Sequence, residues 1–190
     1  MEKIIRHIRR KDRPVVYAFT TYSAIFDDQY REGQPNRLKL MRHLREAFLT
    51  GCPDRDKSPS GMDRLLIETR EGKVENSLHE YCAIAAFADY EGKGNQQHEI
   101  VQSCFHLRCA DCIATEVPVW DGEMAGCIDV VLYGPANDKV ILLDFKPNAH
   151  KEQKAATQLF YYKKLLVQQT GIDNMECYYF DDTHCYKVLI

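Results

Sequence analysis

The strongest constraint on the fold is a strand-like segment at 139–146, in which an apolar run is followed by charged residues. Residues 139–146 read Lys-Val-Ile-Leu-Leu-Asp-Phe-Lys. The uninterrupted apolar run at 140–143 predicts a strand that is buried on both faces. A charge in such a strand is costly unless it is paired or binds a metal ion. We therefore expect Asp144 and Lys146 to serve a site rather than to face solvent.

The segments around this strand predict one α/β domain, with the order β-β-β-α-β-β from residue 114. Asp121-Gly122 is a strong hairpin signal, and 134–138 is a second turn between strand-like segments. A chain of 190 residues suffices for one such domain and is too short for two full-sized ones. The expected elements are strands at 114–120, 126–133 and 139–146, a helix at 152–169, and a closing hairpin of 177–181 and 186–190.

The first 73 residues predict a mostly helical N-terminal extension of a core that spans 74–190. Pro14 would end the first helix, and Gly51 stands where a residue just past a helix end is expected. The region 96–113 is ambiguous, and we favour a helix followed by a turn. The elements expected before it are a helix at 1–13, a strand at 15–21, a helix at 37–49, a loop at 52–61 and a helix at 74–90.

Asp129, Asp144 and Lys146 are the residue types expected at a divalent-metal site. Asp144 and Lys146 share one face, because side chains two positions apart on a strand point to the same side. The ring of Phe145 then points into the core, while its carbonyl can still reach an ion. Asp129 lies late in the preceding strand, where a short antiparallel connection can bring it beside Asp144. Two carboxylates suit Mg²⁺ or Mn²⁺, and a nearby lysine suits phosphodiester hydrolysis.

Five short motifs occur in a fixed order along residues 74–190. They are Leu78-His79-Glu80, Glu116-Val117-Pro118-Val119, Gly126-Cys127-Ile128-Asp129, Asp144-Phe145-Lys146 and Gln158-Leu159-Phe160-Tyr161-Tyr162. The set resembles the RecB/Cas4-like exonuclease branch of the PD-(D/E)XK nuclease superfamily, whose pattern runs E-V-P-V, G-x-x-D, (D/E)-x-K and Q-x-x-x-Y and which has a metal-ligating histidine on a preceding helix, the position that His79 matches. The resemblance implies a restriction-endonuclease-like α/β fold. Its small mixed central sheet of four or five strands, with a βββαβ core, would be flanked by helices on both sides.

The resemblance also implies a role for each matched residue around the metal ion. His79, Asp129 and Asp144 would hold Mg²⁺ or Mn²⁺, helped by the carbonyl of Phe145. Lys146 would orient or activate the attacking water and stabilise the pentacovalent phosphate. These assignments place Asp129, Asp144 and Lys146 in the catalytic set.

Three further residues would complete the site. Glu116 would lie beside the metal-bound water and belongs to the expected catalytic set. Gln158 and Tyr162, one turn apart on a helix, would contact the substrate or brace the site. The implied activity is metal-dependent cleavage of phosphodiester bonds, in DNA rather than RNA, by an exonuclease-like enzyme.

Each of these residues also has an ordinary structural interpretation. The 144–146 segment could be an ion pair on a solvated edge strand. His79 could be a helix histidine with satisfied hydrogen bonds, and Glu116 could be a surface residue. Gln158 and Tyr162 could form a plain helix face. The buried character of the 140–143 run and the order of the motifs favour the functional interpretation.

The chain contains eight cysteines, and some of them have spacings found in metal sites. Cys109 and Cys112 have zinc-site spacing and lie near Cys104 and His106, but a second pair is missing. A cysteine hydrolase would need an activated thiol, and nothing in the sequence marks Cys82 or Cys104 as one. We favour reduced structural thiols over a zinc site.

The Cas4-like exonucleases hold an iron–sulfur cluster, which raises the same question here. Their ligands are one cysteine upstream of the nuclease core and three near the C-terminus. This chain offers Cys52 upstream, but only Cys177 and Cys185 after the helix at 152–169. One ligand is lacking, so we do not expect the cluster.

Charge and hydropathy exclude few classes of protein. The net charge of −3 gives no support to non-specific nucleic-acid binding, although residues 1–57 carry 13 Lys and Arg against 8 Asp and Glu. No apolar run approaches the roughly 20 residues that span a bilayer. The N-terminal segment lacks the apolar region of a signal peptide. We therefore expect a cytoplasmic location.

Other functions stay open at this point. An RNA endonuclease, or a toxin or viral nuclease of the same fold, would carry the same motifs, because the metal site recognises only the phosphate. A non-catalytic nucleic-acid-binding module would have no need to keep Asp129, Asp144 and Lys146 together. A cysteine-rich zinc module would be distinguished by its metal content.

Overall fold

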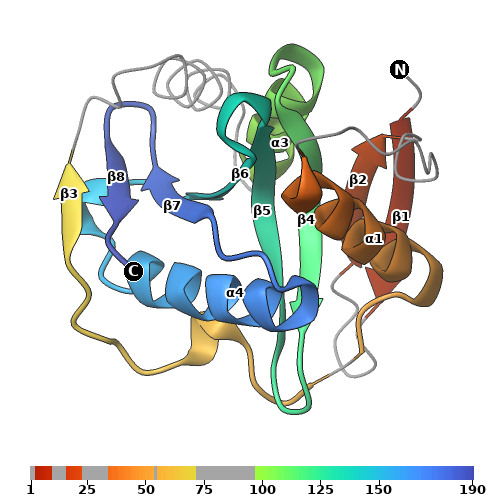
Figure 1. Ribbon diagram of the computed structural model, residues 1–190. Coiled ribbons are helices and arrows are strands. Elements are labelled where there is room, and N and C mark those ends of the chain that lie inside the picture. Colours follow the sequence, from red (N-terminus) through yellow and green to blue (C-terminus); the bar gives the residue numbers. More distant parts are fainter. Residues whose placement is uncertain (1–2, 10–15, 23–33, 54, 72–96) are drawn as a thin grey trace.

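The computed structural model describes residues 3–9, 16–22, 34–53, 55–71 and 97–190, which form one mixed α/β unit (Figure 1). Its strands form a single eight-stranded sheet with the order β1-β2-β4-β5-β6-β7-β8-β3. The strands are β1 (Lys3–Arg9), β2 (Val16–Tyr22), β3 (Thr69–Glu71), β4 (Cys112–Trp120), β5 (Ala125–Gly134), β6 (Lys139–Phe145), β7 (Met175–Phe180) and β8 (Cys185–Val188). The helices are α1 (Pro35–Thr50), α3 (Gln97–Arg108) and α4 (Ala155–Thr170), with short 3₁₀ turns η2 (Pro59–Gly61), η3 (Pro135–Asn137) and η4 (Ala149–Lys151).

Strand direction follows from the connections between strands. β6 and β7 are parallel, and α4 provides the long crossover that a parallel pair requires. All other neighbours in the sheet are antiparallel. The β4–β5 hairpin turns at Asp121, whose Oδ1 accepts hydrogen bonds of 2.7 Å from the backbone N–H groups of Glu123 and Met124. The hairpin signal at 121–122 is thus confirmed.

Helices cover both faces of the sheet (Figure 1). On one face, α1 and α4 pack side chains such as Leu44 and Leu159 against the strands; we call this the α1/α4 layer. On the other face, α3 contributes Val101 and Phe105 to a second cluster, the α3 layer. Along β6, Leu142 faces the α1/α4 layer, whereas Leu143 and Phe145 face the α3 layer. Within the described residues, no helix is long and apolar enough to cross a membrane.

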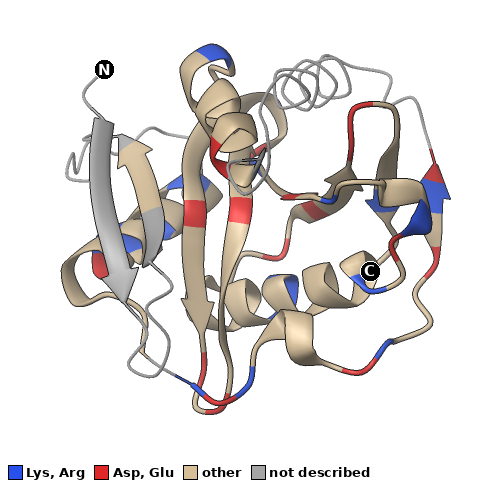
Figure 2. Ribbon diagram, turned by 180° about the vertical axis from the view of Figure 1, so that it is seen from behind, with Lys and Arg blue, Asp and Glu red and all other residues tan. Residues whose placement is uncertain are grey.

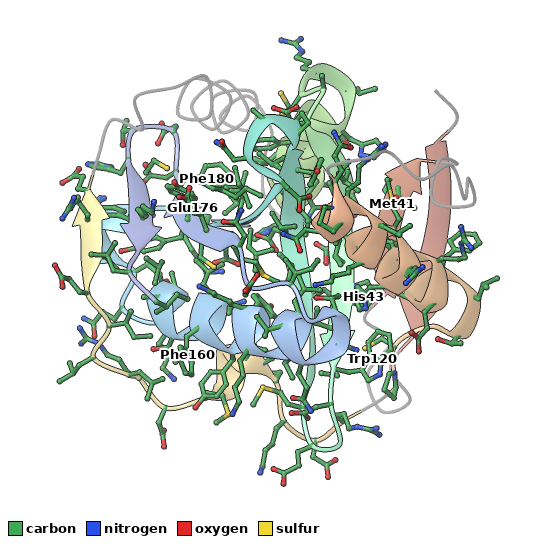
Figure 3. All side chains as sticks on the ribbon, in the orientation of Figure 1. Met41, His43, Trp120, Phe160, Glu176 and Phe180 are labelled. Atoms are coloured by element: carbon green, nitrogen blue, oxygen red, sulfur yellow. The ribbon has the colours of Figure 1, made fainter. Side chains whose placement is uncertain are left out.

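The helices begin and end where their sequences favour it. Pro35 opens α1 in the first helical turn, where its missing N–H costs nothing. Gly171 closes α4 with a left-handed φ of 65°, which glycine adopts readily. His43 anchors α1 on β4, because its Nε2 donates to the carbonyl of Pro118 at 3.0 Å and its ring lies beside Trp120 (Figure 3). Burial lowers the pKa of His43 to about 4, so this histidine is a neutral core residue.

The elements predicted after residue 96, the strand at 15–21 and the helix at 37–49 are confirmed to within a few residues, but the helix predicted at 1–13 is wrong. Residues 3–9 form strand β1, not part of a helix at 1–13, and pair with β2 over seven positions. The segment is rich in isoleucine, which favours a strand once a partner is available. The described part of residues 1–73 therefore contributes three strands and one α-helix, and the sheet is wider than the expected four or five strands. The helix expected at 74–90 lies outside the described residues.

Candidate active site

Three acidic residues lie in one row across the middle of the sheet. Glu116 on β4 stands opposite Asp129 on β5, and Asp144 on β6 continues the row one position beyond the last β5–β6 pair. All three residues are buried, and Asp144 is completely so. Acidic residues on neighbouring central strands are visible side by side in Figure 2. We call Glu116, Asp129 and Asp144 the acidic row.

A kink in β4 turns Glu116 out of the regular strand pattern. Its φ is 51°, which is uncommon for any residue other than glycine. Ala114 and Val117 both face the α1/α4 layer although they are three positions apart, whereas a regular strand would place them on opposite faces. The Glu116 carboxylate Oε1 instead accepts a hydrogen bond from Gln102 Nε2 on α3. Strained backbone of this kind is concentrated at functional sites.

Asp129 is held at the point where the β5–β6 ladder ends. The last backbone pair is Val130–Leu143, and the N–H of Phe145, two residues further along β6, donates to Asp129 Oδ2 at 2.8 Å. His98 Nδ1 of α3 lies 3.3 Å from the same oxygen. The hydrogen bond with Asp129 raises the pKa of His98. The Asp129 side chain thus takes the place of a backbone acceptor on β5, and this hydrogen bond fixes its carboxylate beside Asp144.

Asp144 and Lys146 form a close, buried pair. Lys146 Nζ lies 2.6 Å from Asp144 Oδ2, yet neither oxygen of Asp144 accepts a hydrogen bond of good geometry from the described residues. Burial raises the pKa of Asp144 to about 7, against the opposing effect of Lys146. Burial alone would lower the pKa of Lys146, but the carboxylates of Asp144 and Asp129 outweigh it and raise that pKa. Lys146 therefore stays a cation at neutral pH.

The acidic row combines buried carboxylates with a neighbouring lysine, but in the described residues no three ligand atoms of the row and His98 lie within 4.8 Å of one another, so a bound ion would have to draw them closer. Burial and the charge of Asp129 raise the pKa of Glu116 to about 8. Asp129 likewise raises the pKa of Asp144, so its negative charge disfavours ionisation of both neighbours in the row. A bound cation would offset this repulsion and would add a second positive charge beside Asp144, whose Oδ2 already lies 2.6 Å from Lys146 Nζ. The oxygen donors fit Mg²⁺ or Mn²⁺.

Gln158 and Tyr162, two of the predicted site residues, belong to α4, and Tyr162 packs in the α1/α4 layer, on the face of the sheet opposite α3. Gln158 Nε2 donates to Tyr162 Oη at 2.9 Å, and both side chains are buried. Burial raises the pKa of Tyr162 well above its usual value, and the charges of Asp144 and Asp129 add to the effect. Tyr162 therefore lies within electrostatic reach of Asp144 and Asp129, and Gln158 is joined to it by the hydrogen bond.

Phe145 lies within the described residues and its placement can be compared with the prediction, whereas that of His79 cannot. The Phe145 ring points into the α3 layer, as expected, and lies 5.6 Å from the ring of Phe180. Its contact with the acidic row is made by its backbone N–H. His79 lies outside the described residues, so its placement beside the ion stays a prediction.

Sequence reasoning missed two residues of the site, His98 and Gln102. They lie one turn apart on α3 and reach Asp129 and Glu116, respectively. The signal was present as a His-x-x-x-Gln spacing, which places both side chains on one helix face shortly before the strand that carries Glu116. The ambiguous pattern of 96–113 concealed it.

The two cysteine sets considered as metal sites are not assembled in the described residues. Cys112 Sγ lies 3.9 Å from His106 Nδ1, but no three ligand atoms of Cys104, His106, Cys109 and Cys112 converge within 4.8 Å of one another. Cys177 packs in the α1/α4 layer and Cys185 in the α3 layer, on opposite faces of the sheet.

Comparison of the chain with protein-family models, curated proteins and solved structures gives no match in any of the three. Its function is therefore argued from the geometry of the acidic row and its neighbours.

Proposed function

We propose that the acidic row and Lys146 form the active site of a Mg²⁺- or Mn²⁺-dependent nuclease. The observation that carries the proposal is Asp144, a fully buried carboxylate beside Asp129 with no well-formed hydrogen bond among the described residues. A buried charge of this kind is destabilising unless a cation compensates it, and Lys146 compensates only one of the carboxylates.

The topology around the row supports a restriction-endonuclease-like fold. Strands β4, β5 and β6, helix α4 and strand β7 follow one another as the βββαβ core that the sequence resemblance implies. Helices flank the sheet on both faces, and the parallel β6–β7 pair makes the sheet mixed. The additional strands β1, β2, β3 and β8 extend this core at its edges.

Asp129 and Asp144 would hold the metal ion, and His98 stands where a histidine ligand or its hydrogen-bond support would be needed. A bound Mg²⁺ or Mn²⁺ supplies positive charge to the phosphate and lowers the pKa of a bound water. Burial and Asp129 raise the pKa of Glu116, and a bound cation would lower that pKa again, so that the carboxylate would be ionised and able to accept a proton. Such a group is suited to take a proton from the attacking water.

Lys146 would act by its charge. Because its pKa is raised, it is not suited to remove a proton at neutral pH. Its ammonium group can instead stabilise the negative charge that develops on the phosphate oxygens. Gln158 and Tyr162 would brace this side of the site, since they bond to each other beneath the acidic row.

A cleavage assay tests the proposal directly. End-labelled single- and double-stranded DNA and RNA are incubated with the purified chain and Mn²⁺, with and without EDTA. We expect cleavage of DNA that EDTA stops and that excess Mn²⁺ restores. Asp144→Asn should abolish it, whereas Glu123→Gln, which alters an exposed acid paired with Lys57, should not. Cleavage by Asp144→Asn at the wild-type rate, or cleavage that resists chelation, would contradict the proposal.

A further inference from the structure

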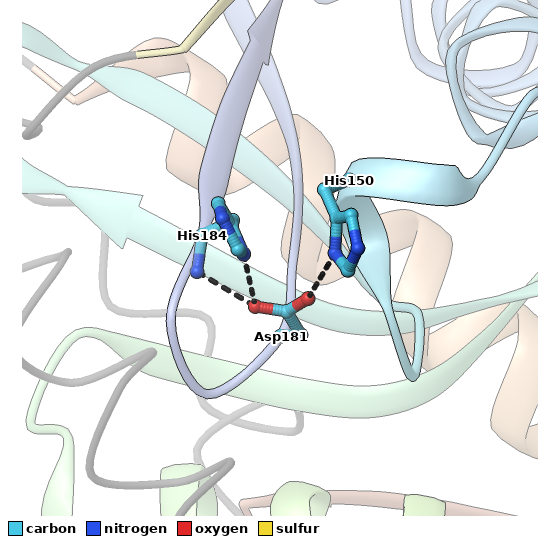
Figure 4. A group of neighbouring side chains, drawn as sticks. All are labelled: His150, Asp181 and His184. Carbon is cyan, nitrogen blue, oxygen red and sulfur yellow. Dashed lines mark hydrogen bonds and ion pairs between the residues drawn. The ribbon is translucent and has the colours of Figure 1, made fainter.

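A second group of metal-ligating side chains lies at the turn between β7 and β8. His150 comes from η4, after β6, whereas Asp181 and His184 come from the β7–β8 turn (Figure 4). One ligand atom of each residue lies within 4.8 Å of those of the other two. Across the described ranges, no other three His, Cys, Asp or Glu side chains converge in this way.

The carboxylate of Asp181 is fixed in place by the backbone around it. Its Oδ1 accepts hydrogen bonds from the N–H groups of Thr183 at 2.8 Å and His184 at 2.6 Å, and its Oδ2 accepts one from Ala149 at 2.6 Å. Burial alone would raise the pKa of Asp181, but these donors outweigh burial and lower that pKa. Asp181 is therefore a buried, ionised and oriented carboxylate.

The two histidines lie next to each other, and each approaches a different oxygen of this carboxylate (Figure 4). His184 Nδ1 lies 3.2 Å from Asp181 Oδ1, and His150 Nδ1 lies 4.0 Å from Oδ2 (Figure 4). Their ring centroids are 5.0 Å apart. The Nε2 of His184 lies 3.9 Å from Glu71 Oε1 at the end of β3. At this distance no hydrogen bond forms, so Glu71 only places a carboxylate near the nitrogen at which metal-bound imidazoles are commonly oriented.

We propose that His150, Asp181 and His184 bind one Zn²⁺, or another divalent ion of similar softness, at a site separate from the acidic row. Two imidazoles and one carboxylate suit Zn²⁺, whereas Mg²⁺ favours oxygen ligands alone. Three protein ligands leave a position for water. The ion would tie the β7–β8 turn to the segment that leaves β6, in which His150 follows Lys146 by four residues.

Metal titration of the full, untagged chain tests this site. Metal-stripped protein is titrated with Zn²⁺ by calorimetry, and Co²⁺ is used as a spectroscopic substitute. We expect wild type to bind one Zn²⁺ at this site, and His150→Ala and His184→Ala each to weaken binding more than about tenfold. Lys151→Ala, which changes the exposed neighbour of His150, should bind as wild type. Asp144→Asn should also retain the ion, because it alters only the acidic row.

Thermal melting provides a second readout that does not depend on the affinity measurement. Zn²⁺ should raise the Tm of wild type and of Lys151→Ala, but not that of the two histidine variants. Their metal-free Tm should stay near that of wild type, since both side chains are partly exposed. Wild-type Zn²⁺ affinity in both histidine variants would overturn the site. Loss of Zn²⁺ in Asp144→Asn together with retention in His184→Ala would also overturn it and would assign the ion to the acidic row.

Discussion

The backbone N–H of Phe145 donates a hydrogen bond to the side chain of Asp129 at 2.8 Å, where the β5–β6 ladder ends. Asp129 is therefore positioned by the backbone of the strand that carries Asp144. Because the strand holds this carboxylate, the two acids are kept close even though the charge of Asp129 raises the pKa of Asp144. Substitutions that change charge but keep shape should separate catalysis from folding at this site.

The metal-free protein should lose stability as the pH rises from 6.5 to 8.5. The folded-state pKa values of Asp144 and Glu116 are raised to about 7 and about 8, so the unfolded chain releases protons that the folded chain retains. Stability linked to these protons is lost as the pH rises through those values. His43, whose pKa is lowered, opposes this trend only below about pH 6.5.

We expect a loss of at least about 1 kcal/mol, or roughly 3 °C in Tm, over this interval. Thermal melts in EDTA at both pH values measure it. Glu116→Gln should flatten the pH dependence, and Mn²⁺ should reduce it in wild type. An unchanged pH dependence in Glu116→Gln would show that Glu116 does not titrate in this range.

Lys146→Met should lower the cleavage rate by about 100-fold or more, since it removes a cation from the phosphate oxygens in a buried site. Mn²⁺ binding should persist, because Asp129 and Asp144 remain. Single-turnover cleavage and Mn²⁺ titration measure the two effects separately. Lys57→Met, an exposed lysine paired with Glu123, is the matched control. A variant that keeps its rate but loses Mn²⁺ would reverse the assigned role.

Gln102→Ala should shift the cleavage pH profile to higher pH. The hydrogen bond from Gln102 opposes the upward shift in the pKa of Glu116, so its loss should raise that pKa further. Leaving a buried carboxylate without this partner should also cost about 1–3 kcal/mol. Cleavage rates between pH 6 and pH 9 and denaturant melts test both effects. The exposed neighbour, in Ser103→Ala, serves as control, and a pH profile identical to wild type would contradict the contact's role.

Gly126→Ala should be destabilising and should lower activity. An added Cβ would lie 2.8 Å from the Tyr162 ring and 2.9 Å from Pro59, and neither ring can move without displacing its neighbours. Overpacking of this kind costs about 1–3 kcal/mol. Gly122→Ala in the same hairpin meets nothing within 4 Å and should behave as wild type. Equal Tm values for the two variants would show that the contact relaxes freely.

Most of the elements that could be predicted from the sequence are marked by local patterns of apolar and turn residues. The run at 140–143 and the turns at 121–122 and 134–138 predicted three strands, and strand periodicity placed Asp144 and Lys146 on one face. Strand β1 was missed because its pairing with β2 decides its conformation, and a helical period was equally consistent with its residues. The pairing of β3 with β8 joins segments more than 100 residues apart, which no local signal reveals.

Convergence of distant residues is the part that sequence alone could not supply. His98 and His79 both lie in helical patterns before β4, and only tertiary packing identifies His98 as the neighbour of Asp129. His150 and His184 are brought together because β6 and β7 run parallel, so that the segments following both strands emerge at one edge of the sheet. His150 and His184 are far apart in the sequence, so no short local motif marks them as a pair.

Strands from the first 71 residues lie at both edges of the sheet. On one side β1 and β2 extend it beyond β4, and on the other β3 pairs with β8. A fragment cut to the motif-bearing part of the chain would therefore bare two strand edges at once, and open edges recruit other chains. A fragment that begins at the first motif is therefore expected to aggregate. Expression, grafting or dissection of this protein has to keep the N-terminal strands attached.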